Sequence, residues 1–187
     1  MNVIIFGPPG AGKGTQSQYI VEKFKLFQVS TGDLLRSEIN NKTEIGKEIE
    51  EIISKGDFAT DDIVNKLIKN IIFDPQKKNK LIFDGYPRSL SQAKNLDFLL
   101  DSSKQKIDFI FFLNVNKDVI IKRIERRKIL EKRSDDDLNI ILKRYDTYMD
   151  TTRPVLDFYS KNSNFYEIDG DKEKSIISSK IEQILTV

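Results

Sequence analysis

The chain has 187 residues, of which 39% are hydrophobic and 32% are charged, so its length and balance fit one soluble domain with a real core. Its net charge of +2 is too small to indicate binding to nucleic acid or to a membrane. The absence of cysteine and histidine excludes disulfides, cysteine-based zinc sites, a Ser-His-Asp triad and a histidine general base. Any chemistry must therefore rely on Lys, Arg and carboxylates, or need no general base.

The N-terminal residues 1–6 run directly into a glycine-rich segment, without a basic leader followed by a long apolar stretch, so no signal peptide is predicted. The longest apolar run, at 109–113, is far shorter than the roughly 20 residues of a membrane span. We therefore expect a cytoplasmic protein with no membrane partner.

Short apolar runs rich in β-forming residues recur along the chain and predict short buried strands. Helical patterns lie between them, with apolar residues three and four apart. Strands that alternate with helices predict a parallel sheet with helices on both faces. The predicted strands cover residues 3–6, 27–29, 81–83, 109–113 and 165–168.

Two features mark helix boundaries. Ser30 or Thr31 can cap a helix that continues through residues 33 and 34. The pattern of residues 30–59 predicts two short helices, inserted between early strands, that could form a small mobile subdomain. The acids of residues 134–137 suit the start of a long helix, which Pro154 is predicted to kink or interrupt.

A glycine-rich segment at residues 7–15 (GPPGAGKGT) follows a predicted strand and opens a predicted helix. Glycines let backbone N–H groups converge on phosphate oxygens, and the helix N-terminus adds its positive dipole end. Lys13 supplies a full charge that can follow a phosphate as it moves. The segment therefore predicts a binding site for the phosphates of a nucleoside triphosphate.

The residue after Lys13 is Gly14, and a hydroxyl comes one place later on Thr15, whereas the general pattern places Ser or Thr directly after the lysine. The hydroxyl that usually binds Mg²⁺ is therefore displaced. We expect Mg²⁺ to be held mostly by nucleotide oxygens and water, with carboxylates further out.

Three blocks resemble the signatures of adenylate kinases, in that family's order and spacing: residues 7–16 (GPPGAGKGTQ), 30–36 (STGDLLR) and 84–88 (DGYPR). Gln92 and the arginine-rich stretch at 123–144 also match, so the resemblance spans nearly the whole chain. It implies reversible transfer of the γ-phosphoryl group of MgATP to AMP, giving two ADP.

The resemblance also implies an α/β fold of the P-loop nucleoside monophosphate kinase type, with a five-stranded parallel sheet flanked by helices. Within a single kinase domain of residues 1–187, it places a small helical AMP-binding insertion at 30–59 and a short lid at 127–133. The core would then comprise residues 1–29, 60–126 and 134–187. A monomer is expected.

For the AMP site, the resemblance assigns Arg36 and Arg88 to the phosphate, which guanidinium groups suit better than ammonium groups. Thr31 and Gln92 would meet the adenine, Gln92 through hydrogen bonds to the base edge. The other implied AMP-binding residues are Asp57, Phe58, Ala59, Gly85, Tyr86, Pro87, Arg133 and Arg144, with Phe58-Ala59 standing where Leu-Val is more usual in the family.

For the ATP site, the resemblance has Arg123 stack on the base, which the backbone around Lys172 also touches. Asp84, with Asp33 as a second candidate, would hold Mg²⁺ through water, and no zinc is expected. The implied ATP-binding residues are Gly10, Ala11, Gly12, Lys13, Gly14, Thr15, Arg123, Arg127 and Lys172. The implied catalytic residues are Lys13, Asp84, Arg88, Arg127, Arg133 and Arg144.

The implied nucleophile is a phosphate oxygen of AMP. The second pKa of a phosphate monoester is about 6, so this oxygen is already deprotonated at neutral pH. The reaction then needs alignment, charge neutralisation and exclusion of water, but no general base. The chemistry therefore suits a chain without histidine.

Three alternatives stay open. A UMP/CMP kinase shares the fold and loop, but typically has Ala where this chain has Thr31 and lacks Gln at the position of Gln92. A nucleotide-dependent switch would have no use for a second basic phosphate site. A purely structural interaction protein would have no use for the strand, glycine loop, lysine and helix together.

Overall fold

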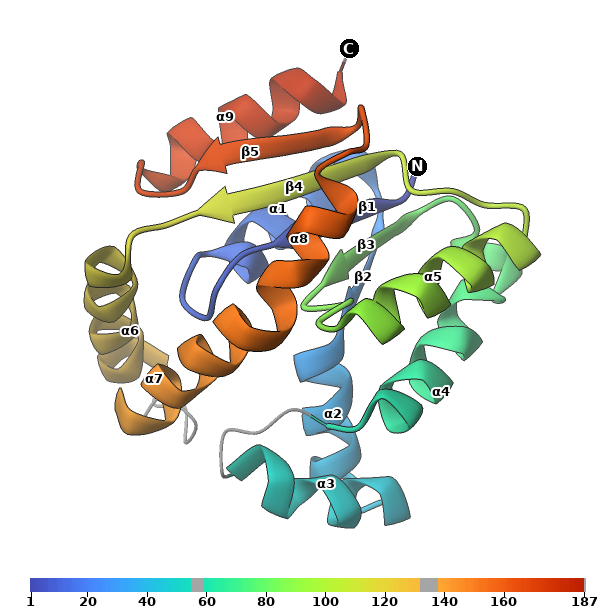
Figure 1. Cartoon of the computed structure of the whole chain (residues 1–187), viewed down its shortest axis with the longest axis horizontal. Coiled ribbons are helices and arrows are strands. Elements are labelled where there is room, and N and C mark those ends of the chain that lie inside the picture. The colour runs from blue at the N-terminus through green and yellow to red at the C-terminus, as the bar shows by residue number, and fades with distance from the viewer. Residues whose placement is uncertain (55–58, 132–137, 187) are drawn as a thin grey trace.

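The computed structural model describes residues 1–54, 59–131 and 138–186. Five parallel strands form one sheet in the order β2-β3-β1-β4-β5, with helices on both faces (Figure 1). The predicted fold class is thus confirmed. The strands are β1 (Val3–Phe6), β2 (Phe27–Ser30), β3 (Leu81–Asp84), β4 (Phe109–Asn114) and β5 (Phe165–Asp169).

Nine α-helices occur in the described residues, together with a short 3₁₀ turn at Pro75–Lys77 and a π turn at Tyr148–Thr152. The helices are α1 (Lys13–Phe24), α2 (Thr31–Asn40), α3 (Glu44–Ser54), α4 (Asp61–Ile72), α5 (Leu90–Ser102), α6 (Lys117–Glu131), α7 (Leu138–Thr147), α8 (Arg153–Tyr159) and α9 (Lys174–Leu185).

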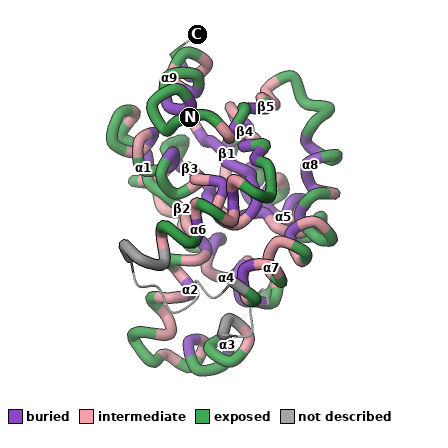
Figure 2. The backbone as a smooth tube through the Cα atoms, turned by 90° about the vertical axis from the view of Figure 1, so that its left-hand side faces the viewer, coloured by how far each residue is buried: buried purple, intermediate pink, exposed green. Residues whose placement is uncertain are grey.

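The central strands alternate their side chains between two apolar clusters, one on each face of the sheet. On β1, Ile4 and Phe6 join the cluster that α4, α5 and α8 cover, whereas Val3 and Ile5 join the cluster that α1 and α9 cover. Figure 2 shows these buried strands at the centre of the molecule. Burial on both faces explains why the strand reads as a continuous apolar run.

The expectation that every strand is fully buried is wrong for the edge of the sheet. β1 and β3 are buried throughout, but on β5 only Ile168 is buried, and Phe165 and Tyr166 are half-buried. An edge strand has a neighbour on one side only, so its side chains are covered less completely than those of β1.

Two local expectations are confirmed. Ser30 caps α2, with its side chain accepting a hydrogen bond from the backbone N–H of Asp33. The helix that contains Pro154 is interrupted by the π turn, in which the N–H of Arg153 bonds to the carbonyl of Tyr148. Proline lacks an N–H and clashes with the carbonyl four residues earlier in a regular helix, and the wider π turn accommodates it.

Residues 30–54 form the two predicted helices, α2 and α3, which project from the sheet at the end where β2 finishes (Figure 1). They cross at Gly46. A Cβ on Gly46 would lie only 2.1 Å from the carbonyl oxygen of Glu38, so only glycine allows this approach.

We predict that Gly46→Ala lowers the stability of the protein by about 1–3 kcal/mol, because a methyl group must push α2 and α3 apart. Thermal unfolding of Gly46→Ala, compared with Lys47→Ala at the exposed neighbouring position, measures the effect. Equal melting temperatures for the two variants would contradict this account of the crossing.

Candidate active site

A cavity of about 920 Å³ opens at the carboxyl ends of the parallel strands, the usual place for a ligand site in such sheets. The loop after β1, the start of α1 and the end of β3 form its floor. Segments of α2, α6, α7 and the π turn form its walls, together with residues 172–174 before α9. Residues distant in the sequence therefore meet around one space.

The loop after β1 has the backbone that its glycines predict. Gly10 and Gly12 have φ angles of +80° and +95°, in the region that favours glycine. A Cβ on Gly10 would also lie 2.8 Å from the side chain of Ile124, because α6 packs directly against the loop. α1 begins at Lys13, so the loop presents a helix N-terminus to the cavity.

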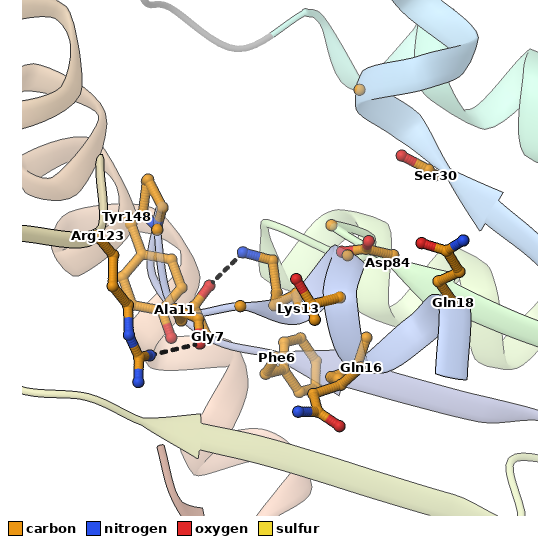
Figure 3. A pocket seen from close by; sticks show the side chains of 18 of the residues that line it. Phe6, Gly7, Ala11, Lys13, Gln16, Gln18, Ser30, Asp84, Arg123 and Tyr148 are labelled. Atoms are coloured by element: carbon orange, nitrogen blue, oxygen red, sulfur yellow. Dashed lines mark hydrogen bonds between the residues drawn. The ribbon is translucent and has the colours of Figure 1, made fainter. Parts of the chain in front are cut away.

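The ammonium group of Lys13 lies within this loop. Its Nζ donates a hydrogen bond to the carbonyl oxygen of Gly7 at 2.8 Å (Figure 3) and another to that of Pro8 at 3.2 Å. Burial lowers the pKa of Lys13 to about 8; Asp84 raises it, and Arg88 and Arg127 lower it further. The charge that would neutralise a phosphate is thus costly to hold in this site without an anion.

Asp84 ends β3 as a buried carboxylate beside the loop. It is only 8% exposed, and the side chain of Gln28 on β2 donates a hydrogen bond to its Oδ2 at 3.1 Å. Burial raises the pKa of Asp84, while Lys13 and Arg88 act in the opposite direction. A Cβ on Gly14 would lie 3.6 Å from the same oxygen. The carboxylate therefore adjoins the position where the general loop pattern has a hydroxyl.

A second basic cluster surrounds Arg88. Its Nε donates to the carbonyl of Gly85 at 2.6 Å, and one Nη donates to Thr31 Oγ1 at 3.4 Å. Gly85 has a φ of +77°, and a Cβ there would lie 2.9 Å from the guanidinium group. The pKa of Arg88 is lowered to about 10, mainly by burial. The nearby charges of Arg144 and Arg36 also lower this pKa, whereas the carboxylate of Asp84 raises it. The arginines converge on one region and repel one another.

Gln92, Thr31 and Tyr86 lie just behind the cavity wall, and none of them is among its lining residues. Gln92 is 4% exposed; its Oε1 accepts from the N–H of Arg88 and its Nε2 donates to Asp61 Oδ1, each at 2.7 Å. Tyr86 is buried, and its hydroxyl donates to Asn65. In this structure these side chains hold the turn that carries Arg88, and the predicted contact between Gln92 and a base stays a prediction.

Arg123 connects two walls of the cavity. Its guanidinium group donates to the carbonyl of Ala11 (Figure 3) and to that of Lys172, each at 3.2 Å. Arg123 and Arg127, which lie one turn apart on α6, both line the cavity, as the family resemblance implies. Arg126 lines it as well.

Most of the other predicted site residues also line the cavity, but three lie outside the described part of the chain. Those that line it are Gly10, Ala11, Gly12, Lys13, Gly14, Thr15, Asp33, Arg36, Ala59, Asp84, Gly85, Pro87, Arg88, Arg123, Arg127, Arg144 and Lys172. Asp57, Phe58 and Arg133 fall in the ranges 55–58 and 132–137, so their predicted roles lie outside the described residues.

Besides Arg126, sequence reasoning missed several other side chains at or near the cavity, among them Gln28, Tyr148, Thr152 and Asp61. Gln28 lies two residues before Ser30 on the same strand, so the strand period of two could have placed both on one face. Tyr148 and Thr152 follow Arg144 at intervals of four, a helical spacing that could have been noticed. Asp61 gives no such signal, because its contact with Gln92 depends on how α4 packs against α5.

Within residues 1–54, 59–131 and 138–186, no group of three acidic, histidine or cysteine residues could hold a metal ion by itself. The same residues contain no helix with the length and hydropathy of a membrane span.

Comparison with known proteins agrees with this arrangement. The family model described as adenylate kinase matches residues 5–164. An adenylate kinase of Pelagibacter ubique is 48% identical over an alignment that covers all of both chains. This chain belongs to the adenylate kinase family.

Two further adenylate kinases support the assignment. That of Mycoplasma capricolum is 38% identical over 91% of this chain and 92% of its own. That of a Nocardioides species is 35% identical over 100% of this chain and 98% of its own. The alignment with the Pelagibacter adenylate kinase has 213 positions, but this chain has only 187 residues, which means that the Pelagibacter protein contains residues without a counterpart here. The alignment with the Nocardioides protein has 187 positions.

We predict that nucleotide binding takes up protons at alkaline pH. At pH 9 Lys13, with a pKa of about 8, is mostly neutral, and an anionic phosphate chain raises that pKa, so binding of ATP should take up nearly one proton. Affinity should correspondingly fall as the pH rises through about 8. Calorimetry at pH 9 in buffers of different ionisation enthalpy counts the protons.

Lys13→Met is the matched control, because its unbranched side chain is only one atom shorter and has no titrating group. It should bind ATP without the uptake. Equal uptake by the wild type and Lys13→Met would assign the proton to another group.

Proposed function

We propose that this protein is an adenylate kinase, catalysing reversible, Mg²⁺-dependent transfer of the terminal phosphoryl group of ATP to AMP to give two ADP. The observation that carries the proposal is the pairing, in one cavity, of two basic groups suited to binding phosphate. Lys13 and its loop form one, and Arg88 with Arg36 and Arg144 forms the other. A protein that bound a single nucleotide would have no use for the second.

The donor ATP would bind with its phosphates along the loop after β1. Lys13 would exchange its bonds with the carbonyls of Gly7 and Pro8 for phosphate oxygens, whose negative charge would raise its lowered pKa. The base would lie near Arg123 and residues 172–174, where the structure joins α6 to the segment before α9.

The acceptor AMP would place its phosphate between Arg36 and Arg88. An anion at this point relieves the repulsion that lowers the pKa of Arg88. Thr31 and the Gly85–Arg88 turn would form the wall beside it, with Gln92 behind. If Gln92 meets the adenine, its side chain must give up its present bond to Asp61 or to the N–H of Arg88.

Transfer would then depend on alignment and charge. Lys13, Arg88, Arg127 and Arg144 contribute positive charge around the space between the two phosphate groups, and we assign Arg133 the same role from the family resemblance. No side chain need remove a proton from the attacking phosphate. Water must be kept from the transferring group, and the family resemblance assigns this to the insertion at 30–59 and the short lid at 127–133, of which residues 55–58 and 132–133 lie outside the described part of the chain.

The donor set suits Mg²⁺ with few protein ligands. A single buried carboxylate, Asp84, adjoins Gly14 at the loop, and Asp33 lines the cavity farther out. Mg²⁺ typically keeps several waters and is bound by one or two carboxylates together with substrate phosphates. When bound, it would neutralise phosphate charge beside Asp84, whose raised pKa a nearby cation would lower. We also propose a monomeric, cytoplasmic enzyme that needs no zinc.

We predict that Arg88→Ala lowers kcat by a factor of about 10³ or more, since it removes a charge-assisted contact in the transition state. Arg153→Ala, at an exposed arginine outside the cavity, is the matched control and should keep full activity. Coupled assays of ADP formation measure both, with circular dichroism to verify folding. A folded Arg88→Ala variant that turns over at a near-normal rate would rule out the assignment.

AMP should be the preferred acceptor among monophosphates. Thr31 and Gln92, the two positions that separate this chain from UMP/CMP kinases, lie together behind the Arg88 turn. ADP formation from MgATP with AMP, CMP, UMP and GMP in parallel tests this directly. Faster reaction with UMP or CMP would support the alternative kinase, and no reaction with any acceptor would contradict the proposed function.

A further inference from the structure

One polar group in the cavity wall has no role in the arrangement described so far. Tyr148 lies on the π turn after α7 and is 6% exposed, yet it lines the cavity. Its hydroxyl is buried and makes no hydrogen bond in the part of the chain that the structure describes. Buried polar groups in proteins are almost always bonded, so such a hydroxyl calls for an explanation.

The surroundings of Tyr148 point to its missing partner. Arg144 lies four residues before it and Thr152 four residues after it, and all three line the cavity. Thr152 is committed to the protein, because its hydroxyl donates to the carbonyl of Arg88 at 3.0 Å. That bond fixes the π turn against the turn that carries Arg88. Figure 3 places Tyr148 on the side of the cavity that holds Arg123, Gly7 and Ala11.

Resting on the proposed function, we infer that Tyr148 is a further substrate-binding residue, whose hydroxyl donates a hydrogen bond to an oxygen of the phosphate chain between the loop and Arg88. The ligand class is thus a polyphosphate that bridges the two phosphate-binding groups. The residue belongs to neither of the sets that the sequence predicted.

A neutral donor suits this position better than another cation would. The positive groups here already oppose one another: Arg88 and Arg127 lower the pKa of Lys13, and Arg144 lowers that of Arg88. Burial raises the pKa of Tyr148, so the phenol keeps its proton and stays a donor. It can bind a phosphate oxygen without adding to the repulsion in the free enzyme.

The test is Tyr148→Phe, which removes only the hydroxyl. The matched control is Tyr145→Phe, an identical change three residues earlier, where the ring lies under Lys117 Nζ at 5.0 Å and does not line the cavity. Isothermal titration with P1,P5-di(adenosine-5′) pentaphosphate, which spans both phosphate-binding groups, should give about tenfold weaker binding for Tyr148→Phe and no change for the control. Equal affinity for Tyr148→Phe and the wild type would overturn the inference.

Two more readouts separate substrate binding from a structural role. Without ligand, Tyr148→Phe should melt at the same temperature as the wild type or higher, because the hydroxyl that is lost has no hydrogen-bond partner among the described residues. A lower melting temperature would mean that the hydroxyl stabilises the fold. In steady-state assays kcat should fall about tenfold while KM for ATP and for AMP changes less than about threefold. A change confined to KM would place the hydroxyl away from the transferring group.

The two proposals fail in different ways. Wild-type protein that forms no ADP would refute the proposed function, and the comparison of pentaphosphate affinities would still decide the role of Tyr148.

Discussion

Repulsion among buried positive groups is the constraint on which the arrangement of this site depends. The pKa of Lys13 falls to about 8 and that of Arg88 to about 10, in each case through burial and through neighbouring arginines. One buried carboxylate, Asp84, offsets both. Such a cluster is unfavourable without an anion and favourable around phosphates, so nucleotides bound as we propose would gain binding energy where charge must be neutralised.

The fold holds these charges apart and in place through backbone carbonyl groups. Lys13 bonds to Gly7 and Pro8, and Arg88 bonds to Gly85. In both cases the carbonyls belong to glycine-containing turns at the carboxyl ends of β1 and β3, so the sheet itself fixes the distance between the two groups. Further from the chemistry, Asp61 and Thr152 fasten the Arg88 turn to α4 and to the π turn.

Features that depend on local sequence could be predicted, whereas those that depend on how distant elements pack against one another could not. Alternating strands and helices, the cap at Ser30 and the break before Pro154 depend on local chemistry, and the glycine loop is local too. The exposure of β5 could not be predicted, because it depends on which strands lie at the edge. Nor could the engagement of Gln92 by Asp61, since that contact arises from the packing of α4 on α5.

The candidate site shows the same division. Family resemblance supplied the charged residues that we propose contact phosphate, and these do gather around one cavity wherever the structure describes them. It supplied neither Gln28, which orients Asp84, nor Tyr148. Both are uncharged and lie outside the conspicuous motifs, so only the three-dimensional arrangement reveals them.

The π turn at Tyr148–Thr152 also sets the rotational phase between two helices. In an α-helix each residue advances about 100° around the axis, so the wider turn leaves α8 rotated relative to the direction that α7 would have continued. α7 can thus direct Arg144 toward the cavity while α8 directs Val155 and Tyr159 into the core. Deleting one residue from the turn would restore a regular helix. That helix could then not direct Arg144 toward the cavity and Val155 and Tyr159 into the core at the same time.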